Sequence, residues 1–137
     1  MSLISNLAKE LKLTYIRENG EEACRQARQR KQDPVEFLEG LLTQEVERRA
    51  GNGITRRINE AKFPIKKYLV DFDKQKYAPK FKAKFAELET LEFIENNENI
   101  MLVGTPGAGK THYAIALGIL ACMAGKKAYF SQAHQAL

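Results

Sequence analysis

The residues best suited to chemistry lie in one short glycine-rich segment. Gly104, Gly109, Lys110 and Thr111 match the phosphate-binding pattern G-x-x-x-x-G-K-[ST] at every fixed position. A triphosphate must be held by several backbone N–H groups that converge on one point, and glycines let the main chain approach more closely than a Cβ permits. The candidate nucleotide-binding residues are therefore Gly104, Thr105, Pro106, Gly107, Ala108, Gly109, Lys110, Thr111 and His112.

Two side chains of this loop have expected roles toward ATP and Mg²⁺. Lys110 is expected to reach the β- and γ-phosphates, and the Thr111 hydroxyl is expected to ligate the metal ion. His112 closes the segment but has no part in that chemistry, and we interpret it as a partly exposed helix residue. The alternative is an ordinary glycine turn with one exposed lysine.

The elements around the loop predict an α/β P-loop NTPase core. Residues 100–103 form a short apolar run with the length of a buried parallel strand, and residues 114–124 predict a helix rich in Ala, Leu and Ile. That helix should begin near Gly109, where its unpaired N–H groups and positive dipole end would favour an anion. Residues 127–131 predict a second strand, and residues 132–137 predict the start of another helix.

The chain before this core predicts an all-α module. Apolar residues recur every fourth position from Leu3 to Leu11, and Asn19-Gly20 should end that first helix. A very polar helix is expected over 21–32. Asp33-Pro34-Val35-Glu36 then predicts a capping box that opens a helix ending at Gly51-Asn52-Gly53. These apolar stripes predict either a small core or a surface that docks on a partner.

The middle of the chain predicts shorter pieces. A helix is expected over 54–62, an ordered linker with short helical turns over 65–79, and a further helix over 81–95. We therefore predict three parts: an N-terminal helical module at 1–53, a basic helical and linker segment at 54–95, and the incomplete beginning of a P-loop ATPase domain at 96–137.

Positive charge is concentrated in the middle of the chain. The window 48–84 has a net charge of +9, and six aromatic residues lie among or directly after its cations, the last of them Phe85. Such a segment beside a nucleotide site suggests contact with nucleic acid, although a solvated basic face over a small aromatic core is an equal alternative. The candidate DNA-binding residues are Arg48, Arg49, Arg56, Arg57, Lys62, Lys66 and Lys67.

Composition favours a cytoplasmic protein. No apolar run approaches the ~20 residues of a membrane span, and residues 1–13 lack the long apolar core of a signal peptide. Cys24 and Cys122 match no metal or redox spacing and are expected to be reduced thiols.

Several stretches together resemble the IstB type of helper ATPase. They are Thr55 to Pro64, Asp71-Phe72-Asp73, Leu88 to Ile94, and Asn99 to Ala116 with the phosphate-binding loop at its centre. That family assists the transposition of insertion sequences and is similar to the DnaC helicase loaders of the AAA+ superfamily. The resemblance implies a helical adaptor followed by an ATP-dependent core that forms homo-oligomers on DNA and recruits a transposase, with the basic window facing the DNA.

One departure from the family concerns hydrolysis. Glu98 is the last acidic residue and Arg57 the last arginine, whereas a hydrolytic P-loop core needs carboxylates and arginines after the loop. We therefore expect an N-terminal portion of a longer protein, with no catalytic residues of its own and no ATP turnover. Two alternative functions remain: a DnaC-like loader of a replicative helicase, and a noncatalytic remnant that binds DNA or protein.

Overall fold

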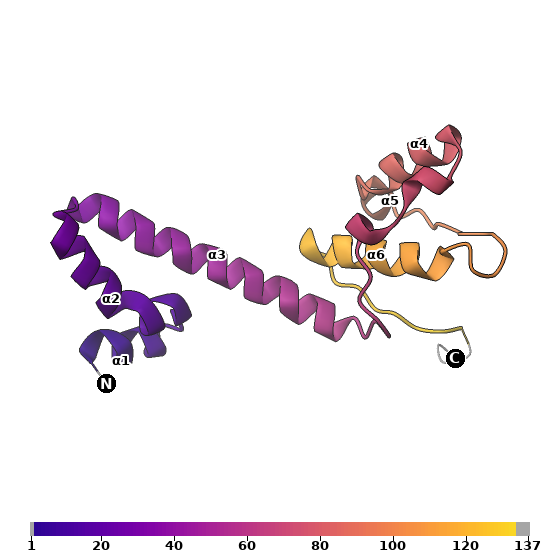
Figure 1. Ribbon diagram of the computed structural model, residues 1–137. Helices are drawn as coiled ribbons and strands as arrows, with labels where there is room; N and C mark the ends of the chain where they lie inside the picture. Colours follow the sequence, from indigo (N-terminus) through magenta and orange to yellow (C-terminus); the bar gives the residue numbers. More distant parts are fainter. Residues whose placement is uncertain (1, 134–137) are drawn as a thin grey trace. The chain divides into compact units, whose positions relative to one another are not determined.

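The computed structural model describes residues 2–133, and its regular elements are helices. The chain divides into two compact units, an N-terminal unit, Met1–Gly53, and a C-terminal unit, Ile54–Leu137. The elements, labelled in part in Figure 1, are α1 (Leu3–Glu10), α2 (Thr14–Arg30), α3 (Pro34–Glu60), the 3₁₀ helices η1 (Leu69–Asp71) and η2 (Lys74–Lys76), α4 (Pro79–Leu88), α5 (Glu92–Glu95) and α6 (Lys110–Met123).

The first helix ends earlier than the sequence predicts. The chain turns at Lys12, whose φ is 59°, and the N–H of Leu13 donates to the Ala8 carbonyl at 2.8 Å. This is a Schellman turn with a lysine in the left-handed position that glycine usually occupies. The prediction that Gly20 ends a helix is wrong, because Gly20 lies inside α2 and is buried. A Cβ there would lie 3.2 Å from Ile16 and 3.4 Å from Ile4, so this glycine allows α1 and α2 to approach closely.

The third helix is one continuous element. The half of its predicted capping box that Asp33 supplies is confirmed: the Asp33 carboxylate accepts from the N–H groups of Val35 at 3.0 Å and Glu36 at 3.2 Å. The predicted stop at 51–53 is wrong, since α3 continues to Glu60. A glycine inside a helix costs only about 1 kcal/mol and ends the helix only where the backbone turns left-handed. That turn occurs at Lys62, whose φ is 62°.

A buried carboxylate joins α3 to α2 in the N-terminal unit. Glu45 is only 5% exposed, and its Oε2 accepts from the N–H of Ile16 at 2.9 Å. Leu13, the residue before α2, offers no side-chain cap. Glu45 therefore satisfies an N-terminal amide of α2 from another helix, and its negative charge suits that end of the helix dipole.

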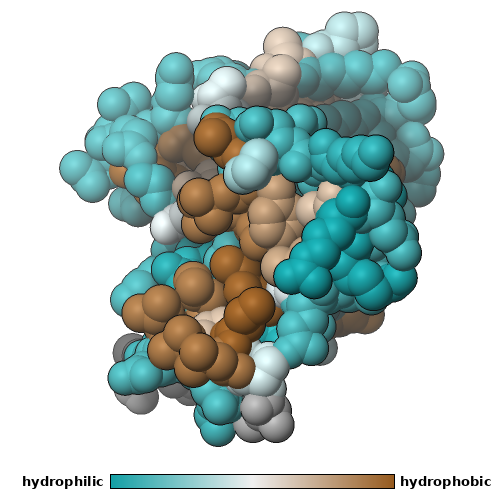
Figure 2. Space-filling view, turned by 90° about the vertical axis from the view of Figure 1, so that its left-hand side faces the viewer, coloured by the Kyte–Doolittle hydropathy of each residue, from teal (hydrophilic) through white to brown (hydrophobic). Residues whose placement is uncertain are grey.

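Apolar side chains also remain exposed in the N-terminal unit. Brown, hydrophobic surface gathers on the face shown in Figure 2, which is the side that carries α1 and α2 in Figure 1. The large apolar residues of this unit that are exposed are Leu3, Ile4, Leu7, Leu11, Val35, Leu38, Leu42 and Val46. The expected apolar stripes are therefore only partly buried in this unit, and much of their surface remains exposed.

The core of the C-terminal unit surrounds α6. The helix follows the glycine-rich loop as predicted and ends at Met123, where Gly125 adopts a φ of 90°. One face packs with Phe85 and Leu91, in and just after α4. Gly118 lies under Phe63, so close that a Cβ would come within 2.8 Å of that ring. Since α6 is enclosed on several sides, it can hold the loop before it in a fixed place.

The predicted α/β core is not seen: residues 2–133 contain no strand. Segments 100–103 and 127–131 are extended but form no ladder. In the first, Ile100 and Leu102 pack on the core, whereas Met101 is 86% and Val103 84% exposed. A strand needs a neighbour for its N–H and C=O groups, and the described chain supplies one such bond, from the N–H of Phe130 to the Ala61 carbonyl at 2.7 Å.

The segment before the loop is close to its prediction. Two 3₁₀ turns lie within the expected linker, but the expected helix at 81–95 is divided into α4 and α5 because Leu91 takes a φ of 63°. Gln132 and Ala133 are not helical, and the rest of the predicted last helix lies outside the described residues. Within 2–133, none of the helices combines the length and apolar character that a membrane span requires.

Candidate functional site

The glycine-rich loop has the backbone that a phosphate cradle requires. Gly107 has a φ of 81° and Gly109 a φ of 91°, both in the left-handed region that disfavours other residues. The N–H of Ala108 donates to the Thr105 carbonyl at 3.1 Å and closes the turn between them. Gly109 is then the residue before α6, whose first helical bond runs from the N–H of Tyr113 to the Gly109 carbonyl at 2.9 Å.

The charged and polar groups of the loop gather at the start of α6. The first turn of a helix leaves its N–H groups without partners in the helix, so those of Lys110, Thr111 and His112 can serve an anion. The Lys110 ammonium group donates to the Gly104 carbonyl and so lies across the loop. Thr111 is exposed in the same turn, where its hydroxyl could ligate a metal ion that a nucleotide brings.

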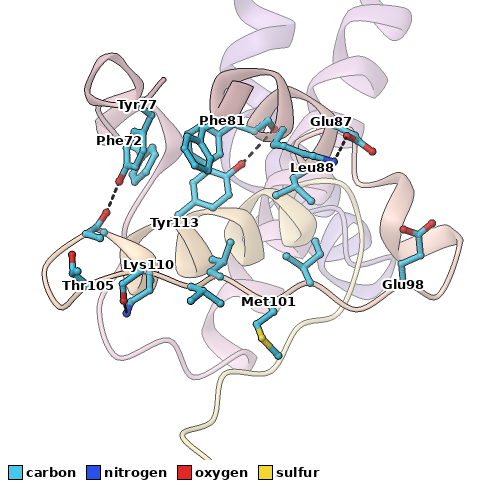
Figure 3. Close-up of a pocket in the computed structure, with 18 residues that line it drawn as sticks. Phe72, Tyr77, Phe81, Glu87, Leu88, Glu98, Met101, Thr105, Lys110 and Tyr113 are labelled. Atoms are coloured by element: carbon cyan, nitrogen blue, oxygen red, sulfur yellow. Dashed lines mark hydrogen bonds and ion pairs between the residues drawn. The ribbon is translucent and has the colours of Figure 1, made fainter. Parts of the chain in front are cut away.

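Residues 68–77, which precede α4, pack against this loop; we call them the strap. The phenol of Tyr77 donates to the Ala108 carbonyl, as Figure 3 shows. A Cβ on Gly109 would lie 3.2 Å from the Phe72 ring and 3.3 Å from the Tyr77 hydroxyl. His112 also faces the strap: its Nε2 lies 3.3 Å from the Tyr68 carbonyl. His112 thus has a structural partner in the strap.

A cavity of about 670 Å³ opens beside the loop (Figure 3). Its walls combine aromatic rings of the strap and α4 with the extended backbone from Ile100 to Thr105, and Lys110 lies at its edge. This volume falls within the range of small-molecule sites, and apolar walls with a few polar groups are typical of them.

An ion pair from Lys74 of the strap and a buried phenol meet at one carboxylate outside the strap. Lys74 pairs with Glu89 at 2.6 Å, and the Tyr113 hydroxyl donates to the same carboxylate at 3.3 Å. Burial, together with the Glu89 charge, raises the pKa of Tyr113 well above its usual range. Tyr113 therefore stays a neutral hydrogen-bond donor near neutral pH.

The seven candidate DNA-binding residues divide into two groups. Three arginines already have partners: Arg48 pairs with Glu18 at 2.7 Å, Arg49 donates to the Lys12 carbonyl at 3.1 Å, and Arg57 donates to the Cys122 carbonyl at 2.8 Å. The Arg48 guanidinium also lowers the pKa of Glu18 by hydrogen bonding. Within the described part of the chain, the remaining four side chains make no ion pair or hydrogen bond; they are Arg56, Lys62, Lys66 and Lys67.

The aromatic residues in and directly after the basic window are mainly core. Phe72, Tyr77 and Phe85 pack in the core of the C-terminal unit, and Phe63 packs on Phe130 with ring centroids 6.4 Å apart. The most exposed are Tyr68 at 40% and Phe81 at 46%. The structure thus favours the small aromatic core over a base-stacking platform for most of these rings.

The residues present fit a nucleotide with its metal ion better than a metal site of their own. No group of three or more His, Cys, Asp or Glu side chains gathers within residues 2–133. Mg²⁺ is commonly held by one or two protein ligands together with substrate phosphates and water, and the Thr111 hydroxyl is the loop side chain that could be one of them.

Sequence reasoning missed the strap as part of the site. Both Phe72 and Tyr77 stood out as aromatic residues of a basic window, and Phe72 also as part of the family resemblance, but nothing in their spacing connects them with a loop that begins at Gly104. The available signal was their number, since a solvated basic face has no need of so many rings.

Comparison with known proteins shows that this chain is similar to ATP-binding proteins of insertion sequences. The family profile described as IstB-like ATP binding protein matches residues 6–137. A Pseudomonas aeruginosa protein named for ATP binding in insertion sequence IS21 is 38% identical over 125 residues, which cover 90% of this chain and 47% of that protein. A protein named in the same way for insertion sequence IS5376 of Geobacillus stearothermophilus is 39% identical over 99 residues, 72% of this chain and 39% of that protein. The chain thus spans about half the length, or less, of these curated relatives.

Proposed function

Because this chain belongs to the family of IstB-like ATP binding proteins, we propose that it binds ATP with Mg²⁺ at residues 104–112 and acts as a helper of transposition. The observation that carries the proposal is the geometry of the loop. Two left-handed glycines precede a helix N-terminus, and a lysine ammonium group lies across the same turn. Backbone amides, a helix dipole and a cation together suit a polyphosphate.

In the proposed complex Lys110 exchanges one partner for another. Its ammonium group leaves the Gly104 carbonyl and binds the β- and γ-phosphates, a stronger charge-assisted contact. The amides of the first turn of α6 bind the same phosphates, and the Thr111 hydroxyl holds Mg²⁺. The cavity beside the loop has room for the rest of the nucleotide.

The wider role concerns DNA and protein partners. The two relatives described above are named for insertion sequences, which supports transposition over helicase loading. We propose that the protein assembles on DNA as a homo-oligomer and recruits a transposase. Arg56, Lys62, Lys66 and Lys67 are the proposed phosphate contacts, since their side chains have no intramolecular partner among the described residues.

Isothermal titration calorimetry with ATP and Mg²⁺ tests the nucleotide site. Wild-type protein should bind, and Lys110→Ala should remove measurable binding, because the variant loses the cation that neutralises the phosphates. Lys127→Ala is the matched control, an exposed lysine of the same unit. Equal affinity of the two variants would refute the proposed site.

A further inference from the structure

We propose that Tyr77 is a positioning residue for the phosphate-binding loop, which orients the Ala108–Gly109 peptide so that its N–H faces the bound phosphates. The proposal deepens the function above and rests on it. It assigns a role to a hydroxyl group that belongs to the strap and lies 31 residues before its partner in sequence.

The hydroxyl acts on one peptide unit of the loop. In a trans peptide the C=O and N–H groups point in opposite directions. The Tyr77 phenol donates to the Ala108 carbonyl and so holds that oxygen toward the strap. The N–H of the same peptide belongs to Gly109 and must point away from the strap. This amide immediately precedes α6, where it adds to the unpaired N–H groups of the first turn.

The phenol is itself held in place by its neighbours. Its ring stacks on Phe72 with centroids 5.5 Å apart and planes 19° apart, and it meets the Phe85 ring edge to face at 5.2 Å. Both neighbours belong to the core around α6. Because the ring has little freedom to turn, its hydroxyl offers the Ala108 carbonyl a fixed donor at small entropic cost.

The fit requires glycine at position 109. Its φ of 91° disfavours any side chain, and a Cβ would lie 3.2 Å from the Phe72 ring and 3.3 Å from the Tyr77 hydroxyl, both closer than ordinary van der Waals contact. The strap also contacts the helix beyond the loop, where Phe72 meets the His112 ring at a centroid distance of 5.3 Å. The strap thus holds the last peptide of the loop and the first turn of α6 as one surface.

Tyr77→Phe separates the role of the hydroxyl from that of the ring. The variant keeps the stacking on Phe72 and loses one hydrogen bond, so its thermal unfolding should remain cooperative. Binding of ATP with Mg²⁺, measured by calorimetry, should weaken about three- to tenfold, the usual effect of one hydrogen bond. The affinity for inorganic tripolyphosphate, which has no base, should fall by the same factor. Tyr129→Phe, which alters a tyrosine that is 76% exposed, should bind both as wild type does.

Hydrogen exchange supplies a readout that does not depend on nucleotide. Amides of residues 104–112 should exchange faster in Tyr77→Phe than in wild type, because the loop loses its tether. Unchanged exchange together with unchanged affinity would overturn the proposal and leave Lys110-dependent binding intact. A loss seen with ATP but not with tripolyphosphate would also overturn it, since the hydroxyl would then serve the base. Failure of wild-type protein to bind either ligand would refute the proposed function itself, and this role with it.

Discussion

Gly107 and Gly109 offer a matched test of how the strap meets the phosphate-binding loop. Both have left-handed backbones, with φ of 81° and 91°, but their surroundings differ. A Cβ on Gly107 would meet nothing within 4 Å, whereas one on Gly109 would lie 3.2 Å from Phe72 and 3.3 Å from the Tyr77 hydroxyl. Substitution by alanine therefore adds backbone strain at both positions and a steric conflict at only one.

The two costs can be estimated separately. Placing a residue with a Cβ in the left-handed region costs roughly 1–2 kcal/mol, which is the whole expected loss of stability in Gly107→Ala. Gly109→Ala adds the cost of forcing atoms into packed surroundings, typically about 1–3 kcal/mol. Its free energy of unfolding should thus fall by about 2–5 kcal/mol, clearly more than that of Gly107→Ala.

Urea unfolding followed by near-ultraviolet circular dichroism measures the difference. This signal reports the C-terminal unit, because apart from Tyr15 and Phe37 the aromatic residues of the chain lie in it. A double variant, Gly109→Ala with Phe72→Leu, should lose less than the sum of its single changes, since the smaller side chain makes room for the new methyl group. Equal stability of Gly107→Ala and Gly109→Ala, or strict additivity in the double variant, would show that the strap does not rest on Gly109.

Two further predictions concern DNA and the thiols. Lys62→Ala combined with Lys66→Ala should weaken binding to duplex DNA of any sequence and reduce the salt slope of log K by about 2, as fluorescence anisotropy over a salt series would measure; an unchanged slope, or an equal effect of Lys9→Ala, would exclude these contacts. Iodoacetamide should label the half-buried Cys24 long before Cys122, which is fully buried and whose pKa is raised by that burial; mass spectrometry showing equal labelling in folded protein would contradict the packing around α6.

Local signals explain where the sequence predicted structure correctly. The loop, the start of α6 and the Asp33 cap each depend on residues within one or two turns, so residue type and spacing suffice to predict them. The ends of helices are harder to predict from the sequence. Lys12 and Lys62 adopt the left-handed conformation that usually marks a glycine after a helix end. Gly20, in contrast, lies inside a helix and allows close helix packing. The residue type alone does not say whether a glycine ends a helix or allows another helix to pack closely against it.

The candidate DNA contacts show that charge alone also does not reveal which residues are available to a ligand. Arg48, Arg49 and Arg57 were grouped with their neighbours by composition, but the fold gives each of them an acceptor within its own unit. Only the folded chain separates these arginines from Arg56, whose side chain has no such partner among residues 2–133.

The sequence by itself was enough to predict a polyphosphate site at residues 104–112, because glycines, a lysine and a helix start within nine positions already indicate the backbone and the charge. Only the tertiary structure decided what surrounds that loop. Phe72 and Tyr77 reach Gly109 and Ala108 because α6 and α4 share one core. The extended segments at 100–103 and 127–131 form no strand ladder within residues 2–133, because strands depend on neighbours across space. Contacts between distant parts of a chain follow from how its buried surfaces fit together, which residue spacing does not record.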